Sequence, residues 1–154
     1  MFNHQPTDYI CPFCQLISGQ ENEFNIPEDV VFQDSNTLAF VSPKWWPKNP
    51  GHVLVIPKTH VENIYDISEG TLSQVYNLGK KISLAIKESY KCDGISFRQH
   101  NEPAGNQEVW HFHLHVFPRW KGDNLYTQHD EFRYVTPDER KPYILKLKNY
   151  FDSH

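Results

Sequence analysis

The sequence has few of the features that mark secreted, membrane or polymer-binding proteins. Its 154 residues include only three cysteines, an odd number that does not suggest a disulfide framework. No apolar run approaches the length of a membrane span, and the N-terminus lacks the basic and apolar regions of a signal peptide. The formal charge of −4, without a basic stripe, argues against a nucleic-acid polymer as partner. We therefore expect a cytoplasmic protein that binds no membrane.

The chain nevertheless contains enough apolar surface to fold. Apolar residues make up 38% of the sequence and aromatic residues 14%, so disorder is not expected. There is no internal repeat, low-complexity tract or linker, and the length suits one domain. We predict one domain over residues 1–154, with a motif-bearing core at about 10–120 and a tail at 121–154.

The hydrophobic pattern indicates an α+β fold. Spacings of three and four predict an amphipathic helix over 71–90. Thr136 begins a capping-box sequence, which predicts a C-terminal helix. Alternating or fully apolar runs predict strands at 30–33, 37–41, 52–56, 95–100 and within 110–120. We predict an antiparallel sheet of about five strands with a long central helix and a C-terminal helix.

The stretch from Trp110 to Trp120 carries the strongest chemical pattern. His111, His113 and His115 alternate with three apolar residues. On a strand, this alternation places the imidazoles on one face and the apolar groups on the other, where they pack on the core. Histidine titrates near neutrality and acts as a base, a nucleophile or a metal ligand. Packing alone explains this pattern poorly, so it indicates catalysis or metal binding.

A second candidate site lies near the N-terminus. Cys11 and Cys14 form a C-x-x-C pair at the start of a short helical segment that ends near Gly19. The pair could be a redox couple, a helix cap, or half of a zinc site that needs two further ligands. The residues alone leave these alternatives open.

Taken together, these segments resemble a known family. The segment His111-Phe-His-Leu-His-Val-Phe117 resembles the signature of the histidine triad family. Pro50-Gly-His-Val-Leu-Val-Ile-Pro-Lys-Thr-His60 resembles its central segment, and Cys11-Pro-Phe-Cys14 and Asn101 to Gln107 fall in its usual places. The resemblance implies a nucleotidyl hydrolase or transferase that cleaves at the α-phosphate through a nucleotidyl-histidine intermediate. Dinucleoside polyphosphates and nucleoside phosphoramidates are the candidate substrates.

The resemblance also implies roles for single residues. His113 would be the nucleophile, and His115 would contact the phosphate and help to organise the leaving group. His52 would support the site from the neighbouring strand. Gln107 would contact the phosphate, and Asn101 would belong to the same substrate-binding loop.

Relatives with the C-x-x-C pair imply a structural zinc ion. The ligands would be Cys11, Cys14, His60 and His111, a closed Cys₂His₂ set that leaves the middle histidine of the motif free. The family also implies a homodimer, with the helix at 71–90 and the strand at 95–100 as the contact regions. A small nucleotide is the expected partner.

The sequence departs from this family in the loop from Ser42 to Pro50. The loop is longer than usual and lacks the aspartate that often contacts ribose, and Asn106 stands where a glycine is expected. Trp45 or Trp46 could form one wall of a nucleoside pocket by stacking on the base. The alternative is that both tryptophans pack inward.

Two other functions stay open at this level. The protein could be a nucleotide-binding regulator with negligible turnover. It could also be a zinc-dependent hydrolase that uses the three motif histidines as metal ligands, although Cys11, Cys14 and His60 favour a closed zinc site instead.

Overall fold

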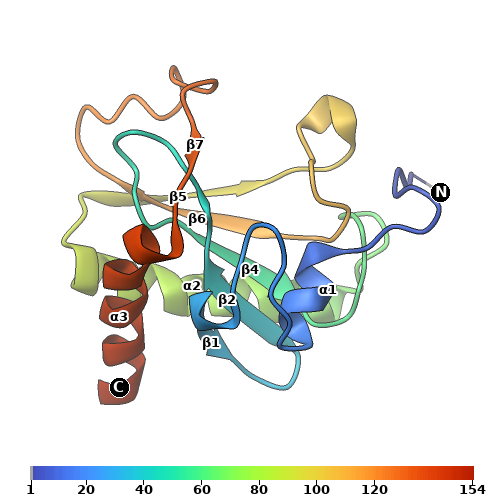
Figure 1. Cartoon of the computed structure of the whole chain (residues 1–154), viewed down its shortest axis with the longest axis horizontal. Helices are drawn as coiled ribbons and strands as arrows, with labels where there is room; N and C mark the ends of the chain where they lie inside the picture. The colour runs from blue at the N-terminus through green and yellow to red at the C-terminus, as the bar shows by residue number, and fades with distance from the viewer. Residues whose placement is uncertain (1) are drawn as a thin grey trace.

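The main sheet is antiparallel and forms the centre of the molecule. A computed structural model describes residues 2–154, and its five-stranded sheet has the order β1-β2-β4-β6-β5 (Figure 1). The strands are β1 (Val30–Gln33), β2 (Thr37–Val41), β4 (Val53–Pro57), β5 (Gly94–Gln99) and β6 (Leu114–Arg119). This arrangement confirms the predicted sheet.

Two long helices pack on the same side of the sheet. Helix α2 (Glu69–Tyr90) crosses behind the sheet in Figure 1, and α3 (Pro137–Ser153) lies beside it near β1. The Ser68 hydroxyl accepts a hydrogen bond from the Thr71 amide and so caps the start of α2. Thr136 and Glu139 form the predicted capping box at the start of α3. The predicted central and C-terminal helices are therefore confirmed.

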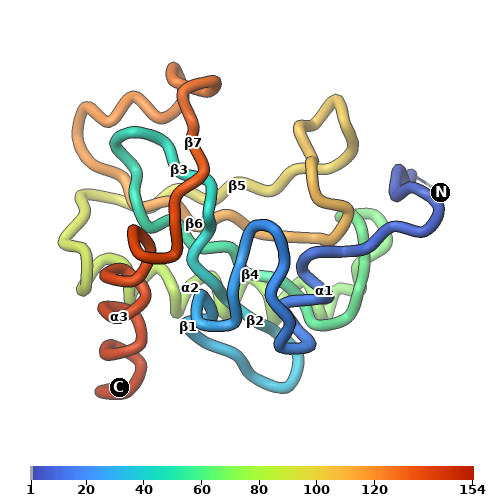
Figure 2. The backbone as a smooth tube through the Cα atoms, in the orientation of Figure 1, coloured from blue at the N-terminus to red at the C-terminus, as the bar shows by residue number. Residues whose placement is uncertain are grey.

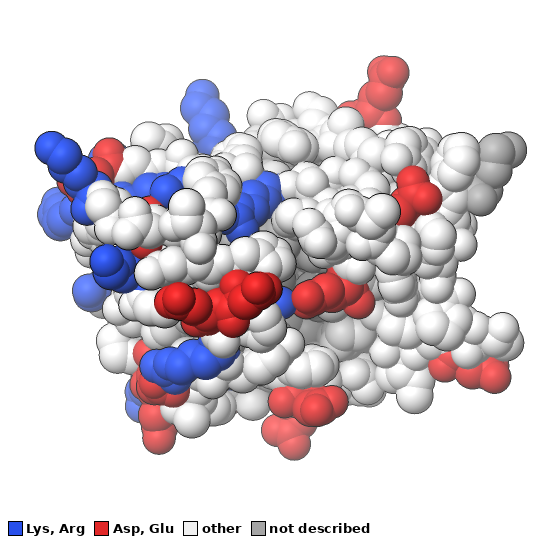
Figure 3. Space-filling model, turned by 90° about the horizontal axis from the view of Figure 1, so that it is seen from above, with Lys and Arg blue, Asp and Glu red and all other residues white. Residues whose placement is uncertain are grey.

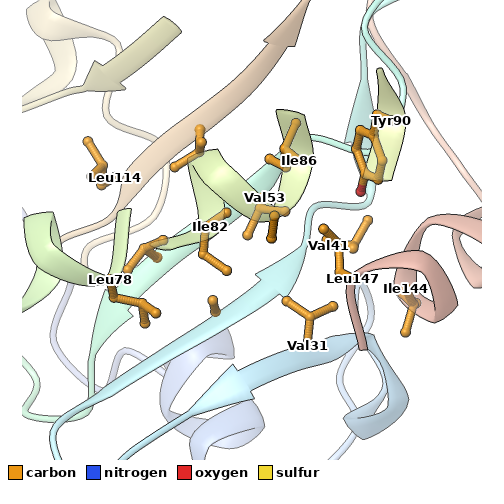
Figure 4. Packing of buried hydrophobic residues seen from close by; sticks show 14 of the residues in the cluster. Val31, Val41, Val53, Leu78, Ile82, Ile86, Tyr90, Leu114, Ile144 and Leu147 are labelled. Carbon is orange, nitrogen blue, oxygen red and sulfur yellow. The ribbon is translucent and has the colours of Figure 1, made fainter. Parts of the chain in front are cut away.

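The strands bury both of their faces. Beneath α2 and α3, the core contains Val31, Val41, Val53, Leu78, Ile82, Ile86, Leu114, Ile144 and Leu147 (Figure 4). On the opposite face, Leu38, Phe40, Leu54 and Ile56 pack against the short helix α1 (Pro12–Ile17). Phe112, Leu114 and Val116 join the α2 side, as predicted. The alternation therefore leaves His113 and His115 for the α1 side of the sheet.

The predicted histidine strand begins later than expected. Strand β6 starts at Leu114, so His111 and His113 precede the strand. In this segment the amide of His111 bonds to the carbonyl of Val109, and the amide of Phe112 bonds to the carbonyl of Val61. The segment pairs with loops rather than with a strand, and one flat row of three imidazoles is not formed.

The tail contacts the loop that leads into β4. Strand β3 (Lys44–Trp45) pairs with β7 (Arg133–Tyr134), and the two lie side by side in Figure 2. Two 3₁₀ helices complete the fold, η1 (Pro27–Asp29) and η2 (Pro103–Gly105). Within residues 2–154, none of the helices has the length and hydrophobicity to cross a membrane.

Candidate active site and metal centre

A cavity of about 690 Å³ lies on the α1 side of the sheet. The predicted residues His52, His113, His115, Gln107 and Trp46 contribute to its lining. Phe13 of α1 forms another part of the wall and packs edge-to-face on His113, with 5.3 Å between ring centres. The cavity therefore brings together motif histidines and the loop before β4, which are far apart in the sequence.

His113 is held in one tautomer. Its Nδ1 lies 2.6 Å from the backbone carbonyl oxygen of His111, and a carbonyl can only accept, so Nδ1 carries the proton. The other ring nitrogen, Nε2, is then left with a lone pair. Burial lowers the pKa of His113 to about 4, which keeps the ring neutral near pH 7. A neutral imidazole with one bare nitrogen is a competent nucleophile.

His115 and His52 lie next to His113 on the same side of the sheet. The ring centres of His113 and His115 are 5.0 Å apart, and His115 Nδ1 lies 3.4 Å from His52 Nε2. His52 stacks on Phe117 at 4.3 Å, and burial lowers its pKa to about 3. Its Nδ1 is buried without a hydrogen-bond partner among residues 2–154. His52 is therefore a neutral, enclosed ring in contact with His115.

The loop residues Gln107 and Asn101 have structural partners. Gln107 lines the cavity, but its side-chain amide donates to the carbonyls of Glu62 and Val109 and accepts from the Glu102 amide. The Asn101 side chain bonds to the Ile64 amide and to Gln99, and it does not line the cavity. In this conformation Gln107 forms part of the cavity wall and Asn101 lies outside the lining, so the substrate roles expected for both stay predictions.

The two tryptophans of the loop point to different places. Trp45 belongs to the hydrophobic core, where it packs on Tyr143 and bonds to the carbonyl of Ser42. Trp46 lines the cavity and packs against His52, Phe117 and Phe132. Of the two tryptophans, Trp46 is therefore placed where a ligand in the cavity could contact it, and its stacking role stays a prediction.

The sequence did not single out Arg98 and His100, which also line the cavity. Arg98 pairs directly with His115 across the β5–β6 ladder. His100 donates from Nδ1 to the carbonyl of Gly105 and packs edge-to-face on His115. The period of two places Arg98 on one face of β5, but only the register with β6 shows that this face carries His115.

The predicted metal ligands form a compact cluster. Cys11, Cys14, His60 and His111 each offer one ligand atom, and these atoms all lie within 4.8 Å of one another. The sulfur–nitrogen distances are 3.3 to 3.7 Å, and the two histidine Nδ1 atoms are 3.2 Å apart. In a tetrahedral zinc site the ligand atoms are separated by roughly 3.3 to 3.8 Å, given the usual zinc–nitrogen and zinc–sulfur bond lengths.

The outer partners of both histidines fit the same interpretation. His111 Nε2 donates to the carbonyl of Pro57 at 2.9 Å, and His60 Nε2 lies 2.7 Å from Gln5 Oε1. With Nε2 protonated, Nδ1 of each ring is bare and faces the two thiols. Such outer hydrogen bonds orient metal-ligating histidines. The residues present therefore fit a zinc ion.

The three motif histidines do not share one metal site. His111 belongs to the cysteine cluster, whereas the protonated Nδ1 of His113 faces a carbonyl. Within the described residues, the metal-ligand cluster contains neither His113 nor His115. The three-histidine zinc hydrolase is thus not supported by the geometry.

Comparison with known proteins gives the class of this fold. Residues 23–122 match the HIT domain, a histidine triad fold. Protein hit of Bacillus subtilis (strain 168) is 37% identical over 116 residues, which cover 75% of each chain. The chain belongs to the HIT family.

Two solved structures extend the comparison. A zinc-bound histidine triad family protein from Mycobacterium smegmatis is 28% identical, with a TM-score of 0.73, and covers 94% of this chain and 97% of its own. A HIT family hydrolase from Legionella pneumophila Philadelphia 1 is 34% identical, with a TM-score of 0.57 over 73% of this chain and 93% of its own. The fold thus has counterparts among solved relatives, one of which is a zinc-bound protein.

Proposed function

We propose that this protein is a nucleotidyl hydrolase or transferase that acts at the α-phosphate of a nucleotide. The observation that carries the proposal is the bare Nε2 of His113, which is held ready by the bond from Nδ1 to the His111 carbonyl. The cavity that surrounds it also offers an aromatic wall for a base. Membership of the HIT family and the relative described as a hydrolase support the same reaction class.

The reaction takes place in two displacements at one phosphorus atom. His113 Nε2 attacks the α-phosphorus, a phosphorus–nitrogen bond forms, and the leaving group departs with the electron pair of its bond. Water or another acceptor then attacks the same phosphorus, gives up a proton and breaks the phosphorus–nitrogen bond. His115, oriented by His52, contacts the phosphate and the leaving group. The products are a nucleoside monophosphate, or its ester with the acceptor, and the leaving group.

The variant His113→Ala tests this proposal. It should remain folded, bind nucleotide and lose turnover of diadenosine tetraphosphate and adenosine phosphoramidate by at least about 10³-fold, because no other group replaces the nucleophile. Mass spectrometry of quenched wild type should find the nucleotide on His113. His154→Ala, which changes an exposed histidine, should match wild type. Binding without turnover in wild type would instead favour a nucleotide-binding regulator.

We further propose that Cys11, Cys14, His60 and His111 hold one structural zinc ion. Bound there, zinc would crosslink α1 to the loop after β4 and to the entry of β6, and a closed four-ligand set offers no open position for substrate. Cys11→Ser should reduce zinc content measured by elemental analysis and lower the melting temperature. Cys92→Ser, at a cysteine outside the cluster, should keep one zinc per chain. Wild type without zinc after growth in ample zinc would contradict the proposal.

The family also supports a homodimer and a nucleotide partner. β5 is an edge strand, and exposed Phe97, Tyr76 and Leu84 lie on β5 and α2. We propose that this surface forms the dimer contact, which sedimentation at micromolar concentration tests. On the face shown in Figure 3, Lys and Arg lie in the left part, mixed with Asp and Glu, and the right part carries only Asp and Glu. Together with the net charge of −4, this favours a small partner over a nucleic-acid polymer. Three free cysteines fit a reducing compartment such as the cytoplasm.

A further inference from the structure

Arg98 differs from every other arginine of the chain. Arg119, Arg133 and Arg140 each bond to a carboxylate, on Asp123, Glu139 and Asp29 respectively. Arg98 forms no ion pair with a carboxylate in the part of the chain that the structure describes, although it is partly buried and lines the cavity. A partly buried charge is costly without an opposite charge. A bound anion would compensate this charge.

The guanidinium is held by aromatic rings. Its central carbon lies 4.8 Å from the ring centre of Phe117, 4.7 Å from that of Tyr126 and 5.8 Å from that of Trp46. Stacking of this kind holds the plane of the side chain while its N–H groups stay available at the edge. A planar fork of donors matches the oxygens of a phosphate.

Arg98 lies on the same face of the sheet as the motif histidines. Arg98 is the direct antiparallel neighbour of His115, so the two side chains emerge on one face. Along that face the ring centres of His113 and His115 are 5.0 Å apart, and those of His115 and Phe117 are 5.6 Å apart. Along this face, His113 is followed by His115 and then by Phe117, on which Arg98 packs. If the α-phosphate lies at His113, the next phosphates of the substrate can therefore extend past His115 toward Arg98.

Lys44 and His115 also line the cavity, but neither supplies an unpaired positive charge near His113. Lys44 lines the cavity, but its ammonium group is bonded to Glu108 at 2.9 Å. Burial lowers the pKa of His115 well below its ordinary value, so that ring is neutral near pH 7. Arginine stays protonated in proteins. Among the described residues that line the cavity, Arg98 is thus the Lys or Arg side chain that has no carboxylate partner.

We propose that Arg98 binds the phosphates beyond the α-phosphate and so promotes the reaction of nucleoside polyphosphates, but not that of nucleoside phosphoramidates. This inference rests on the proposed function. When the bond from His113 Nε2 to the α-phosphorus forms, the bond to the bridging oxygen breaks and its electron pair goes to the departing phosphate. Arg98 compensates that charge. An amine leaving group takes up a proton and leaves without a negative charge, so it gains nothing from Arg98.

The test compares two substrates with different leaving groups. Arg98→Met removes the charge and keeps an apolar stem on Phe117, Arg98→Lys restores a charge, and Lys121→Gln removes an exposed charge outside the cavity lining. Arg98→Met should lower kcat/KM for diadenosine tetraphosphate about tenfold or more, as expected for a lost charged hydrogen bond. It should leave adenosine phosphoramidate nearly unchanged, Arg98→Lys should recover part of the loss, and Lys121→Gln should match wild type. An equal loss on both substrates would overturn the proposal.

A binding experiment separates this inference from the proposed reaction. In calorimetric titrations on the His113→Ala background, ADP should bind more tightly than AMP, and Arg98→Met should remove that difference while AMP affinity stays the same. If wild type hydrolyses neither substrate, the proposed function fails, yet these titrations still decide the role of Arg98. An ADP preference that survives in folded Arg98→Met, with folding checked by circular dichroism, would refute it.

Discussion

At the scale of single residues, Trp46 shows how one side chain serves both the core and the cavity. Its indole nitrogen donates to the carbonyl of His129 and its ring packs edge-to-face on Phe117. Only 7% of the residue is exposed, but it lines the cavity that contains His113. These contacts fix the ring, so the part of it that lines the cavity is held in place before any ligand binds.

We expect Trp46→Ala to weaken nucleotide recognition. Base stacking contributes on the order of 1–3 kcal/mol, so kcat/KM of the folded variant should fall about tenfold, and Trp46→Phe should recover much of it. Because stacking does not read the sugar, wild type should discriminate weakly between ribonucleoside and deoxyribonucleoside substrates. Trp45→Ala is the matched comparison and should reduce stability by about 3–5 kcal/mol through the cavity left in the core. A large ribose preference, or full activity in Trp46→Ala, would contradict this role.

At the scale of elements, the turn into β4 positions His52. Gly51 has a φ of +78°, in the left-handed region that residues with a Cβ rarely adopt. A Cβ at this position would also collide with the ring of Tyr143. Glycine therefore lets the loop approach α3 closely before β4 begins at Val53.

The variant Gly51→Ala should be destabilised by more than the backbone alone explains. Gly19 is the control, since it has the same φ of +78° and a Cβ there would meet no atom within 4 Å. Gly19→Ala should cost about 1–2 kcal/mol, the usual cost of the left-handed conformation. Gly51→Ala should cost clearly more in urea unfolding, because Tyr143 must also move. Equal losses in the two variants would show that the close contact has no energetic weight.

At the scale of the whole molecule, the tail closes onto the first part of the chain. Arg140 on α3 makes two bonds to the Asp29 carboxylate, at 2.8 and 2.9 Å, and both side chains are almost fully buried. Asp29 in turn accepts from the side chain of Asn25 and the amide of Ile26. The tail is therefore tied to residues before the first strand by a fully bonded buried pair.

Breaking this buried pair by replacing Arg140 should lower the stability of the whole domain. Arg140→Met should lower the free energy of unfolding by about 3–5 kcal/mol, because it leaves the Asp29 carboxylate buried without a cation. Arg133→Met, which breaks the exposed pair with Glu139, should change stability little. Chemical denaturation monitored on both halves of the chain should give one transition. A small loss of stability in Arg140→Met would contradict the importance of the buried pair. Separate transitions for the two halves would contradict one cooperative domain.

The sequence alone determined the elements and the ligand types. Period-two and period-three-to-four patterns predicted the sheet, α2 and α3, because side-chain direction follows backbone periodicity. The same local rule placed Phe112, Leu114 and Val116 in the core and left His113 and His115 facing away from it. The four metal-ligating residues came from the family resemblance, and the structure brings them together.

Only the tertiary structure decided which of the candidate residues reach the cavity. Trp45 and Trp46 are adjacent in sequence, yet their surroundings differ because β3 pairs with β7 from the tail. The side-chain amides of Asn101 and Gln107 form hydrogen bonds with the loop at Glu62 and Ile64, and no local sequence pattern predicts these bonds. Arg98 became a site residue through its register with His115 across two strands. Such outcomes depend on contacts between segments distant in sequence, which periodicity does not specify.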